Sequence, residues 1–190
     1  ATNPALVNSS MQIRYAKDYL LAISKKDDAE NREYLVAFNN SNKAIKATIS
    51  TATSKGGWKL LMGKTTVKAV GEKITILVPA LSTIVLKANQ VIDKTNVKVG
   101  KISSDLDFLT GYYETKASVT TQDMAKVTFY IRSAGEQNWS SLGTDTNSPY
   151  MVYVDPLDYE GKTVEVKATA VNSKGVKYEL PSASILIPAP

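Results

Sequence analysis

The sequence predicts an all-β fold made of two consecutive antiparallel β-sandwiches. Short runs alternate apolar and polar residues, as Val127, Phe129 and Ile131 do, and this period of two places the apolar side chains on one face of a strand. Turn-forming Gly, Asn, Ser and Lys residues separate the runs, and no long segment has the helical period. With 190 residues, the chain is long enough for two small domains that each bury a core.

The first predicted domain comprises residues 1–92. Ile45, Ala47 and Ile49 alternate toward one side, and so do Ile74 and Ile76, as expected for strands that face a core. Turn chemistry lies between the runs, at residues 26–31, 39–42, 54–57 and 69–72. Strands are predicted at residues 11–15, 19–25, 32–39, 44–51, 58–62, 73–78 and 83–87.

The second predicted domain comprises residues 93–190, after a seam at residues 88–94 where a fresh series of strands begins. Val164, Val166 and Ala168 alternate in the same way as the residues of the first domain. Hairpin turns are predicted at residues 133–138, 145–149 and 172–175. Strands are predicted at residues 97–102, 114–119, 126–132, 140–142, 150–154, 163–172, 176–179 and 183–187.

The chain contains no Cys and no His, which limits its chemistry. Without Cys there are no disulfides, thiolate nucleophiles or Cys-bound zinc sites, and without His the commonest general base and transition-metal ligand are missing. Catalysis would rest on carboxylates, Lys, Tyr and hydroxyl groups. We therefore expect no cofactor, no metal site and no catalytic residue, and no apolar run approaches the roughly 20 residues of a membrane span.

Charge is distributed unevenly between the two halves. Residues 1–92 contain 13 Lys and Arg against 6 Asp and Glu, whereas residues 93–190 contain 10 against 12. A basic domain can attract nucleic acid. The lysines of the first half are scattered singly, however, and no aromatic residues are interleaved with them as in a nucleic-acid interface. We interpret them as a solvated basic face, with no nucleic-acid partner.

Four segments of the first half carry a family resemblance. Residues 21–25 (LAISK), 32–41 (REYLVAFNNS), 58–61 (WKLL) and 78–86 (VPALSTIVL) follow one another in an order and spacing similar to the C-terminal β-domain of the α-amylase family of glycoside hydrolases. The resemblance implies a Greek-key sandwich that covers one side of a catalytic barrel. It also implies α-glucan substrates and a paired-carboxylate mechanism whose residues all lie in that barrel, which is absent from this chain.

The start of the chain extends the resemblance. Residues 3–8 (NPALVN) are similar to the junction that follows the last barrel helix in this family, with Asn3 in place of the usual His and Asn8 where Gly is common. Asn also tolerates the left-handed conformation of a helix cap. Residues 1–10 are therefore expected to be the remnant of a preceding barrel helix and linker.

The second half resembles an immunoglobulin-like or fibronectin type III-like sandwich. Residues 161–168 followed by 172–175 are similar to a fibronectin type III strand and the turn after it, although Val164 stands where that family has its corner tyrosine. Residues 127–132 and 139–150 resemble modules appended after the β-domain in some bacterial amylase-like enzymes. The resemblance implies an accessory domain.

One predicted turn carries an acidic cluster that consists of Asp27, Asp28, Glu30 and Glu33. Paired carboxylates perform glycosyl transfer when they line a concave site with a raised pKa. This cluster is instead flanked by Lys25, Lys26 and Arg32, so we interpret all four as residues of a solvated turn.

A second group of oxygen-bearing side chains consists of Asp145, Asn147, Asp155 and Asp158. Such side chains are calcium ligands. Their spacing fits no calcium loop, and Asp and Asn are common in hairpins, so we predict turn residues and no metal.

Aromatic residues are the candidates for ligand binding, because sugar rings stack on exposed aromatic faces. Trp139 lies in a predicted turn, and Tyr112 and Tyr113 are adjacent, so that one of the pair faces solvent if they lie on a strand. We name Trp139, Tyr112 and Tyr113 as carbohydrate-binding candidates, with core or edge packing as the alternative for Trp139. Trp58 is expected in the core.

The sequence thus predicts a non-catalytic C-terminal accessory region of a starch-active or α-glucan-active glycoside hydrolase. Its expected partner is the enzyme's own catalytic barrel, and α-glucan is a further candidate. The family resemblance implies an extracellular or periplasmic location in a bacterium. The alternatives are a carbohydrate-binding module that grips α-glucan through exposed aromatic residues and a surface adhesion-type protein of tandem β-domains.

Overall fold

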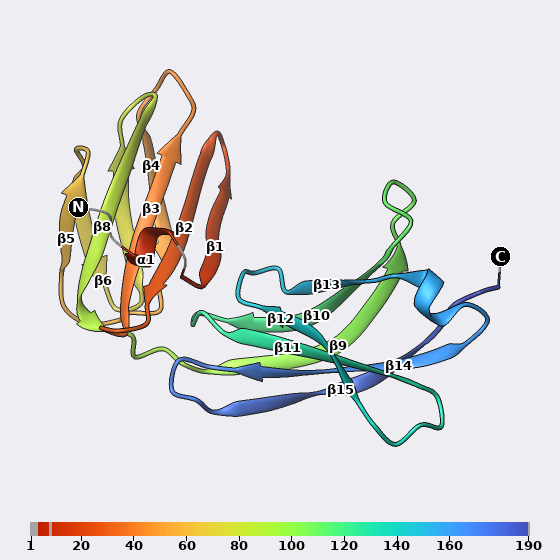
Figure 1. The fold of residues 1–190 in the computed structure, drawn as a ribbon. Coiled ribbons are helices and arrows are strands. Elements are labelled where there is room, and N and C mark those ends of the chain that lie inside the picture. Colours follow the sequence, from red (N-terminus) through yellow and green to blue (C-terminus); the bar gives the residue numbers. More distant parts are fainter. Residues whose placement is uncertain (1–3, 8, 190) are drawn as a thin grey trace. The chain divides into compact units, whose positions relative to one another are not determined.

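The computed structural model describes residues 4–7 and 9–189 and confirms the all-β fold class, with antiparallel sheets throughout (Figure 1). The described chain contains a short helix α1 and a 3₁₀ turn at Pro156–Tyr159 in addition to its strands. Residues Asn3 and Asn8 of the predicted junction lie outside the described residues, and α1 itself spans Pro4–Val7. No helix in the described part of the chain is long and apolar enough to cross a membrane.

The chain divides into two compact units. The first contains Ala1–Asn96 and the short segment Gln122–Met124, and the second contains Val97–Thr121 and Ala125–Pro190. Within the first unit, Met124 forms a small buried cluster with Ala52 and Ile92.

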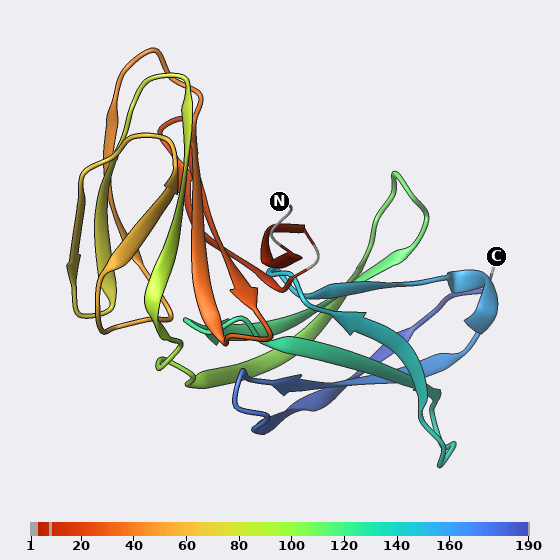
Figure 2. The same cartoon turned by 60° about the vertical axis from the view of Figure 1, so that its left-hand side comes forward.

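The first unit is a sandwich of a five-stranded sheet and a three-stranded sheet (Figures 1 and 2). The larger sheet has the order β1-β2-β3-β8-β5, with β1 at Met11–Lys17, β2 at Leu20–Asp27, β3 at Arg32–Asn39, β8 at Ser82–Val91 and β5 at Trp58–Met62. The smaller sheet has the order β4-β7-β6, with β4 at Ile45–Ser50, β7 at Lys73–Val78 and β6 at Val67–Val70.

The core of the first unit lies between these two sheets. The larger sheet contributes alternate residues of β2, β3 and β8, and the smaller sheet contributes alternate residues of β4 and β7, because side chains on a strand alternate between its two faces. The buried residues are Leu20, Ala22, Leu35, Ala37, Ala47, Ile49, Ile74, Ile76, Val78, Ile84 and Leu86, with Trp58 packed against them. The predicted core position of Trp58 agrees with this half-buried contact.

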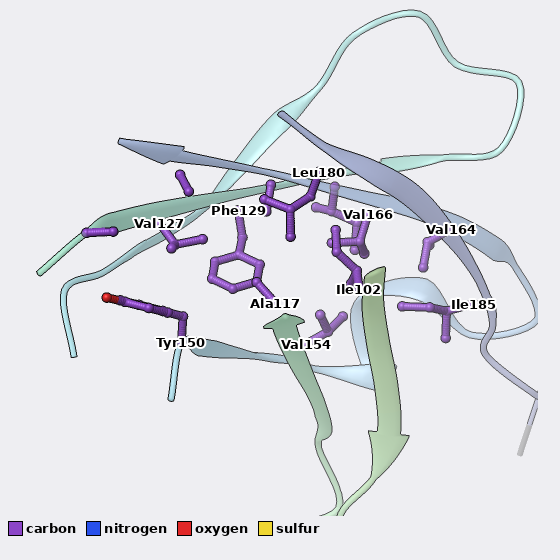
Figure 3. Close-up of a cluster of buried hydrophobic side chains, with 14 of the residues drawn as sticks. Ile102, Ala117, Val127, Phe129, Tyr150, Val154, Val164, Val166, Leu180 and Ile185 are labelled. Carbon is purple, nitrogen blue, oxygen red and sulfur yellow. The ribbon is translucent and has the colours of Figure 1, made fainter. Parts of the chain in front are cut away.

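The second unit is a sandwich of a three-stranded and a four-stranded sheet. The sheet β13-β10-β9 contains β13 at Met151–Val154, β10 at Tyr113–Thr121 and β9 at Val97–Leu106. The sheet β12-β11-β14-β15 contains β12 at Ser140–Asp145, β11 at Lys126–Ser133, β14 at Thr163–Val171 and β15 at Lys177–Leu186. Figure 3 shows its core, where Phe129 and Tyr150 lie among Ile102, Ala117 and the valines of the four-stranded sheet. The immunoglobulin-like assignment remains a prediction.

Some strands extend beyond their predicted ends, as β9 and β12 do relative to the predicted strands 97–102 and 140–142, and two strands differ from the prediction more strongly. β6 was missed because all four of its residues are exposed, so it has no alternation toward a core. Its last two residues, Ala69 and Val70, lie within the predicted turn at 69–72, so the first half of that turn prediction is wrong. The predicted strands 176–179 and 183–187 are one strand, β15. Its register against β14 shifts between Val166 and Ala168, next to Pro181, and Pro is tolerated there because β15 is an edge strand.

Candidate functional site

The five-stranded sheet of the first unit is apolar on its outer face as well as on its core face. The strand register aligns one residue from each strand in a single row across the sheet, because residues directly opposite in antiparallel strands share a face. This row, in spatial order, is Ile13, Ile23, Val36, Val85 and Met62.

A second row reinforces the first. Leu21 pairs with Phe38, which pairs with Thr83, so the two large apolar side chains lie next to one another on the same outer face. Leu21 and Phe38 are 40% and 42% exposed, so a large part of each side chain meets solvent. We call Ile13, Leu21, Ile23, Val36, Phe38, Met62 and Val85 the apolar outer face.

A shallow hollow lies on this face between β2 and β3. Its volume is about 410 Å³, and its lining includes Ala16, Leu21 and Phe38. The continuous apolar run Leu35–Ala37 within β3 is the sequence signal for such a sheet, because a strand buried on both faces loses the alternation of a half-exposed strand. The period of two alone does not reveal this face.

Charged side chains border the apolar outer face at one end. Glu30 bridges two cations there, with Oε2 at 2.7 Å from Lys87 Nζ and 3.3 Å from Arg32 Nε. The hydrogen bond to Glu30, followed by that to Tyr34, raises the pKa of Lys87, and the ammonium group lies 5.3 Å from the centroid of the Tyr34 ring. An apolar centre with a polar rim is the usual anatomy of a protein interface.

The acidic cluster does not behave as one solvated turn. Asp27 accepts hydrogen bonds from the backbone N–H groups of Ala29 and Glu30, and Asp28 forms an ion pair with Lys26 at 3.0 Å, as expected for a turn. The interpretation of Glu33 is wrong, because its side chain is completely buried. Glu33 lies in β3 on the core-facing side, so its position along the strand, and not its acidic neighbours, decides its environment.

Glu33 is held by three partners that the sequence could not connect. Its Oε1 accepts a hydrogen bond from the hydroxyl of Ser24 and forms an ion pair with Arg14 at 3.0 Å. Its Oε2 accepts a hydrogen bond from the backbone N–H of Thr53 at 3.0 Å, and Arg14 Nε donates to Ser24 Oγ at 2.8 Å. The carboxylate is therefore saturated by structural partners, and this arrangement is a buried polar network and not an acid–base pair.

Two of the aspartates considered for calcium, Asp145 and Asp155, organise backbone turns. Asp145 accepts hydrogen bonds from the N–H groups of Asn147 and Met151, both at 2.9 Å, and Asp155 accepts one from Leu157 at 3.0 Å at the start of the 3₁₀ turn. Among the described residues there is no group of three or more His, Cys, Asp or Glu side chains that could hold a metal ion.

The three aromatic candidates lie in different environments. Tyr112 is 41% exposed at the end of the β9–β10 turn, whereas the neighbouring Tyr113 packs against the core of the second unit. Trp139 is half-buried before β12, and two cations lie over its ring, with Arg132 Cζ at 4.4 Å and Lys167 Nζ at 4.5 Å from the ring centroid. Such cation–π contacts occupy a ring face that a sugar would need.

The structure adds Tyr153, which the sequence analysis did not name. Tyr153 is 51% exposed on β13 and lines a hollow of about 230 Å³ together with Tyr112 and Thr110. The alternation of Met151–Val154 was a usable signal, because Val152 and Val154 face the core and Tyr153 must then face outward. The partnership with Tyr112 depends on the pairing of β10 with β13 and has no local signal.

Comparisons with known proteins agree with the first unit's sequence pattern. Residues 14–89 match the family model of the alpha amylase C-terminal all-beta domain. An alpha-amylase from Streptomyces lividans is 32% identical over 180 residues, which cover 91% of this chain and 20% of that protein. The chain thus spans about a fifth of the length of the curated relative it matches.

Two solved structures are similar at low identity. A gamma-CGTase from alkalophilic Bacillus clarkii aligns with a TM-score of 0.36 and 14% identity, over 97% of this chain and 40% of that chain. Domains A168–A170 of titin align with a TM-score of 0.31 and 9% identity, over 89% of this chain and 74% of that chain. TM-scores this low do not establish a shared fold.

Proposed function

We propose, from the match of residues 14–89 to the family model of the alpha amylase C-terminal all-beta domain, that the chain is the non-catalytic accessory region of an α-glucan-active glycoside hydrolase. In this proposal the first unit supports the catalytic barrel of its enzyme, and the apolar outer face packs against that barrel. The second unit is an immunoglobulin-like accessory domain of the same enzyme.

The observation that carries the proposal is the apolar row across all five strands of the larger sheet. A sheet whose outer face met only water would carry polar side chains there, as antiparallel sheets commonly do. Contiguous exposed apolar surface with a polar rim marks an interaction site. Val36 and Val85 at the centre of the row are buried, whereas Ile13, Leu21, Phe38 and Met62 are each at least 40% exposed and are available to a partner of matching apolar character.

The chain's own chemistry supports a non-catalytic role. Glu33, the most deeply buried carboxylate of the acidic cluster, is saturated by Arg14, Ser24 and the Thr53 N–H group. A paired-carboxylate mechanism needs a second carboxyl group about 5–10 Å away across a substrate site. We expect the isolated chain to release no reducing sugar from soluble starch, and measurable hydrolysis would overturn the proposal.

A co-purification experiment tests whether the first unit binds a catalytic barrel. The barrel encoded next to this chain in its gene is expressed separately and captured, and co-purification of the chain is measured. Phe38→Lys and Leu21→Lys place a charge on the apolar outer face and are expected to reduce retention about tenfold or more. Leu77→Lys is the matched control, because Leu77 is an apolar residue of the smaller sheet with a similar exposure of 37%.

The outcomes separate the proposal from its rivals. Retention that falls with Phe38→Lys and Leu21→Lys but not with Leu77→Lys supports it. Equal retention of all variants, or a gene that encodes no barrel, overturns it and leaves the adhesion-type alternative.

The proposal includes an extracellular or periplasmic location, because an α-glucan polymer is too large to cross a bacterial membrane. Cell fractionation of the native host tests this part separately.

A further inference from the structure

The outer face of the sheet β13-β10-β9 in the second unit carries two exposed tyrosines that line one hollow. We propose that Tyr112 and Tyr153 form a docking platform for a neutral oligosaccharide of α-linked glucose. The choice of glucose polymer rests on the proposed function, whereas the platform itself rests on the geometry of these side chains. Nothing in the family match reaches this part of the chain, because the match covers residues 14–89.

The strand register places polar groups beside the two rings. Glu114 lies directly opposite Tyr153 on β13 and directly opposite Asp105 on β9, so the three side chains form one row on the outer face. Tyr112 lies in the turn just before β10 and lines the same hollow as Tyr153. The hollow between the rings has a volume of about 230 Å³, and Thr110 completes its lining. Aromatic faces flanked by hydrogen-bonding groups suit a sugar, which presents apolar C–H faces and hydroxyl edges.

The turn that carries Tyr112 is held by its own hydrogen bonds. Asp107 accepts from the Leu109 N–H at 3.0 Å and from the Thr110 hydroxyl at 2.9 Å. The backbone closes the turn as well, because Gly111 N–H donates to the Asp107 carbonyl at 2.7 Å and Asp107 N–H donates to the Tyr112 carbonyl at 2.8 Å. A platform that is fixed before binding loses less conformational entropy when a ligand arrives.

The charges on this face favour a neutral ligand. Lys116 Nζ lies 2.6 Å from Glu114 Oε2, so the lysine is already paired. Asp105 and Glu114 give the row beside Tyr153 an acidic character that opposes nucleic acid and anionic membrane surfaces. Carboxylates accept hydrogen bonds from sugar hydroxyls without needing a charged partner.

The other exposed aromatic residues fit a sugar less well. The Trp139 ring lies within 4.5 Å of two cations, and the side chain belongs to the opposite sheet of the sandwich, before β12. Phe108 is 90% exposed at the tip of the β9–β10 turn but does not line the hollow. Both residues therefore serve as matched controls for the loss of an aromatic side chain.

The test measures binding of maltoheptaose by calorimetry and retardation of the full 190-residue chain in gels that contain amylopectin. The variants are Tyr112→Ala, Tyr153→Ala, Trp139→Ala and Phe108→Ala, each checked for its unfolding transition. We expect Tyr112→Ala and Tyr153→Ala each to weaken binding about tenfold, while Trp139→Ala and Phe108→Ala bind within about twofold of the unaltered chain. Cellohexaose serves as the control for the linkage between the glucose units.

Any other set of binding results overturns the proposal that Tyr112 and Tyr153 form a platform. Absence of binding by the unaltered chain removes it, and so does loss of binding with Trp139→Ala or Phe108→Ala while the tyrosine variants bind normally. Equal binding of cellohexaose contradicts the assignment to α-linked glucose. Co-purification with the barrel reports on the first unit alone, so Tyr112→Ala and Tyr153→Ala are expected to leave it unchanged, and the two proposals can fail independently.

Discussion

Arg14 and Glu33 form an ion pair in the interior of the first unit, with Arg14 Nη2 and Glu33 Oε1 3.0 Å apart and side-chain exposures of only 5% and 0%. The two residues come from β1 and β3, with β2 between them, and Ser24 of β2 bonds to both. Burial of two charges is costly, and the cost is offset only when each has good partners. The Ser24 hydroxyl and the Thr53 N–H group supply those partners here.

Glu33→Gln is expected to destabilise the first unit by about 3–5 kcal/mol, because it leaves the Arg14 charge buried without its counter-ion. The matched control is Glu30→Gln, whose ion pairs lie at the surface and contribute about 0–1 kcal/mol. Urea unfolding measures both variants. The chain has two Trp residues, so a Trp139→Phe background makes Trp58 fluorescence a reporter of the first unit. Equal losses for the two variants would contradict the importance of burial.

Asn39→Asp is expected to destabilise the first unit by about 2–4 kcal/mol. The Asn39 amide nitrogen donates to the carbonyl groups of Lys43, Val78 and Pro79 at 2.8, 3.1 and 2.9 Å. Aspartate has nearly the same shape but no donor, so it leaves these carbonyl groups facing a carboxylate.

Asn40→Asp is the control for Asn39→Asp, because Asn40 is exposed. We expect it to change the free energy of unfolding by no more than about 0.5 kcal/mol. The same fluorescence measurement applies to both variants. An unchanged free energy of unfolding for Asn39→Asp would show that the hydrogen bonds of the Asn39 side-chain amide do not hold the end of β3 to the segment after β7.

Gly63→Ala is expected to destabilise the first unit by about 2–3 kcal/mol. Gly63 has φ of +86°, and an added Cβ would collide with the carbonyl oxygen of Thr83. Gly71→Ala separates the steric collision from the backbone strain, since Gly71 has φ of +56° but a Cβ added there would meet no atom within 4 Å. We expect that variant to lose about 1 kcal/mol from backbone strain alone. Similar losses at both sites would exclude the collision as a cause.

The Asp107 turn is expected to weaken in acid. The backbone hydrogen bond from Leu109, and then the hydroxyl of Thr110, lower the pKa of Asp107. Because the folded pKa lies below the ordinary value of about 3.9, the stabilisation is complete above that pH and is lost as the pH falls through the lowered pKa. NMR titration of the Asp107 carboxyl group measures this.

Thr110→Val is the matched variant for the Asp107 titration, because it removes the hydroxyl donor and keeps the side-chain shape. We expect it to move the Asp107 pKa back toward the ordinary value. A titration midpoint at or above about 3.9 in the unaltered chain would contradict the hydrogen bonds that hold this turn.

Several elements could be predicted because their signals are local. The predicted strands 32–39, 58–62 and 73–78 coincide with β3, β5 and β7, since alternation and turn residues within a few positions decide where a strand runs. The four exposed residues of β6 show the limit of this signal. An edge strand whose side chains all meet solvent is recognised only by its hydrogen-bonded partner, which here is β7.

The candidate sites were harder to predict from the sequence than the strands. Tyr112 and Tyr113 were chosen as an adjacent pair of which one faces solvent if both lie on a strand; Tyr112 is exposed, but it lies in the turn before β10, and only Tyr113 belongs to the strand. The second ring of the platform, Tyr153, is 41 positions from Tyr112 and meets it through the pairing of β10 with β13. Glu33 was misassigned because six charged residues surround it in sequence, while its strand turns it toward the interior.

The sequence by itself determined the all-β class, most strand positions and the match of residues 14–89 to the alpha amylase C-terminal all-beta domain, because periodicity and motif order are properties of contiguous residues. Only the tertiary structure decided which residues from different strands stand side by side. The row of Ile13, Ile23, Val36, Val85 and Met62 depends on strand register, which is set by contacts between segments far apart in the chain. The burial of Glu33 against Arg14 has the same origin.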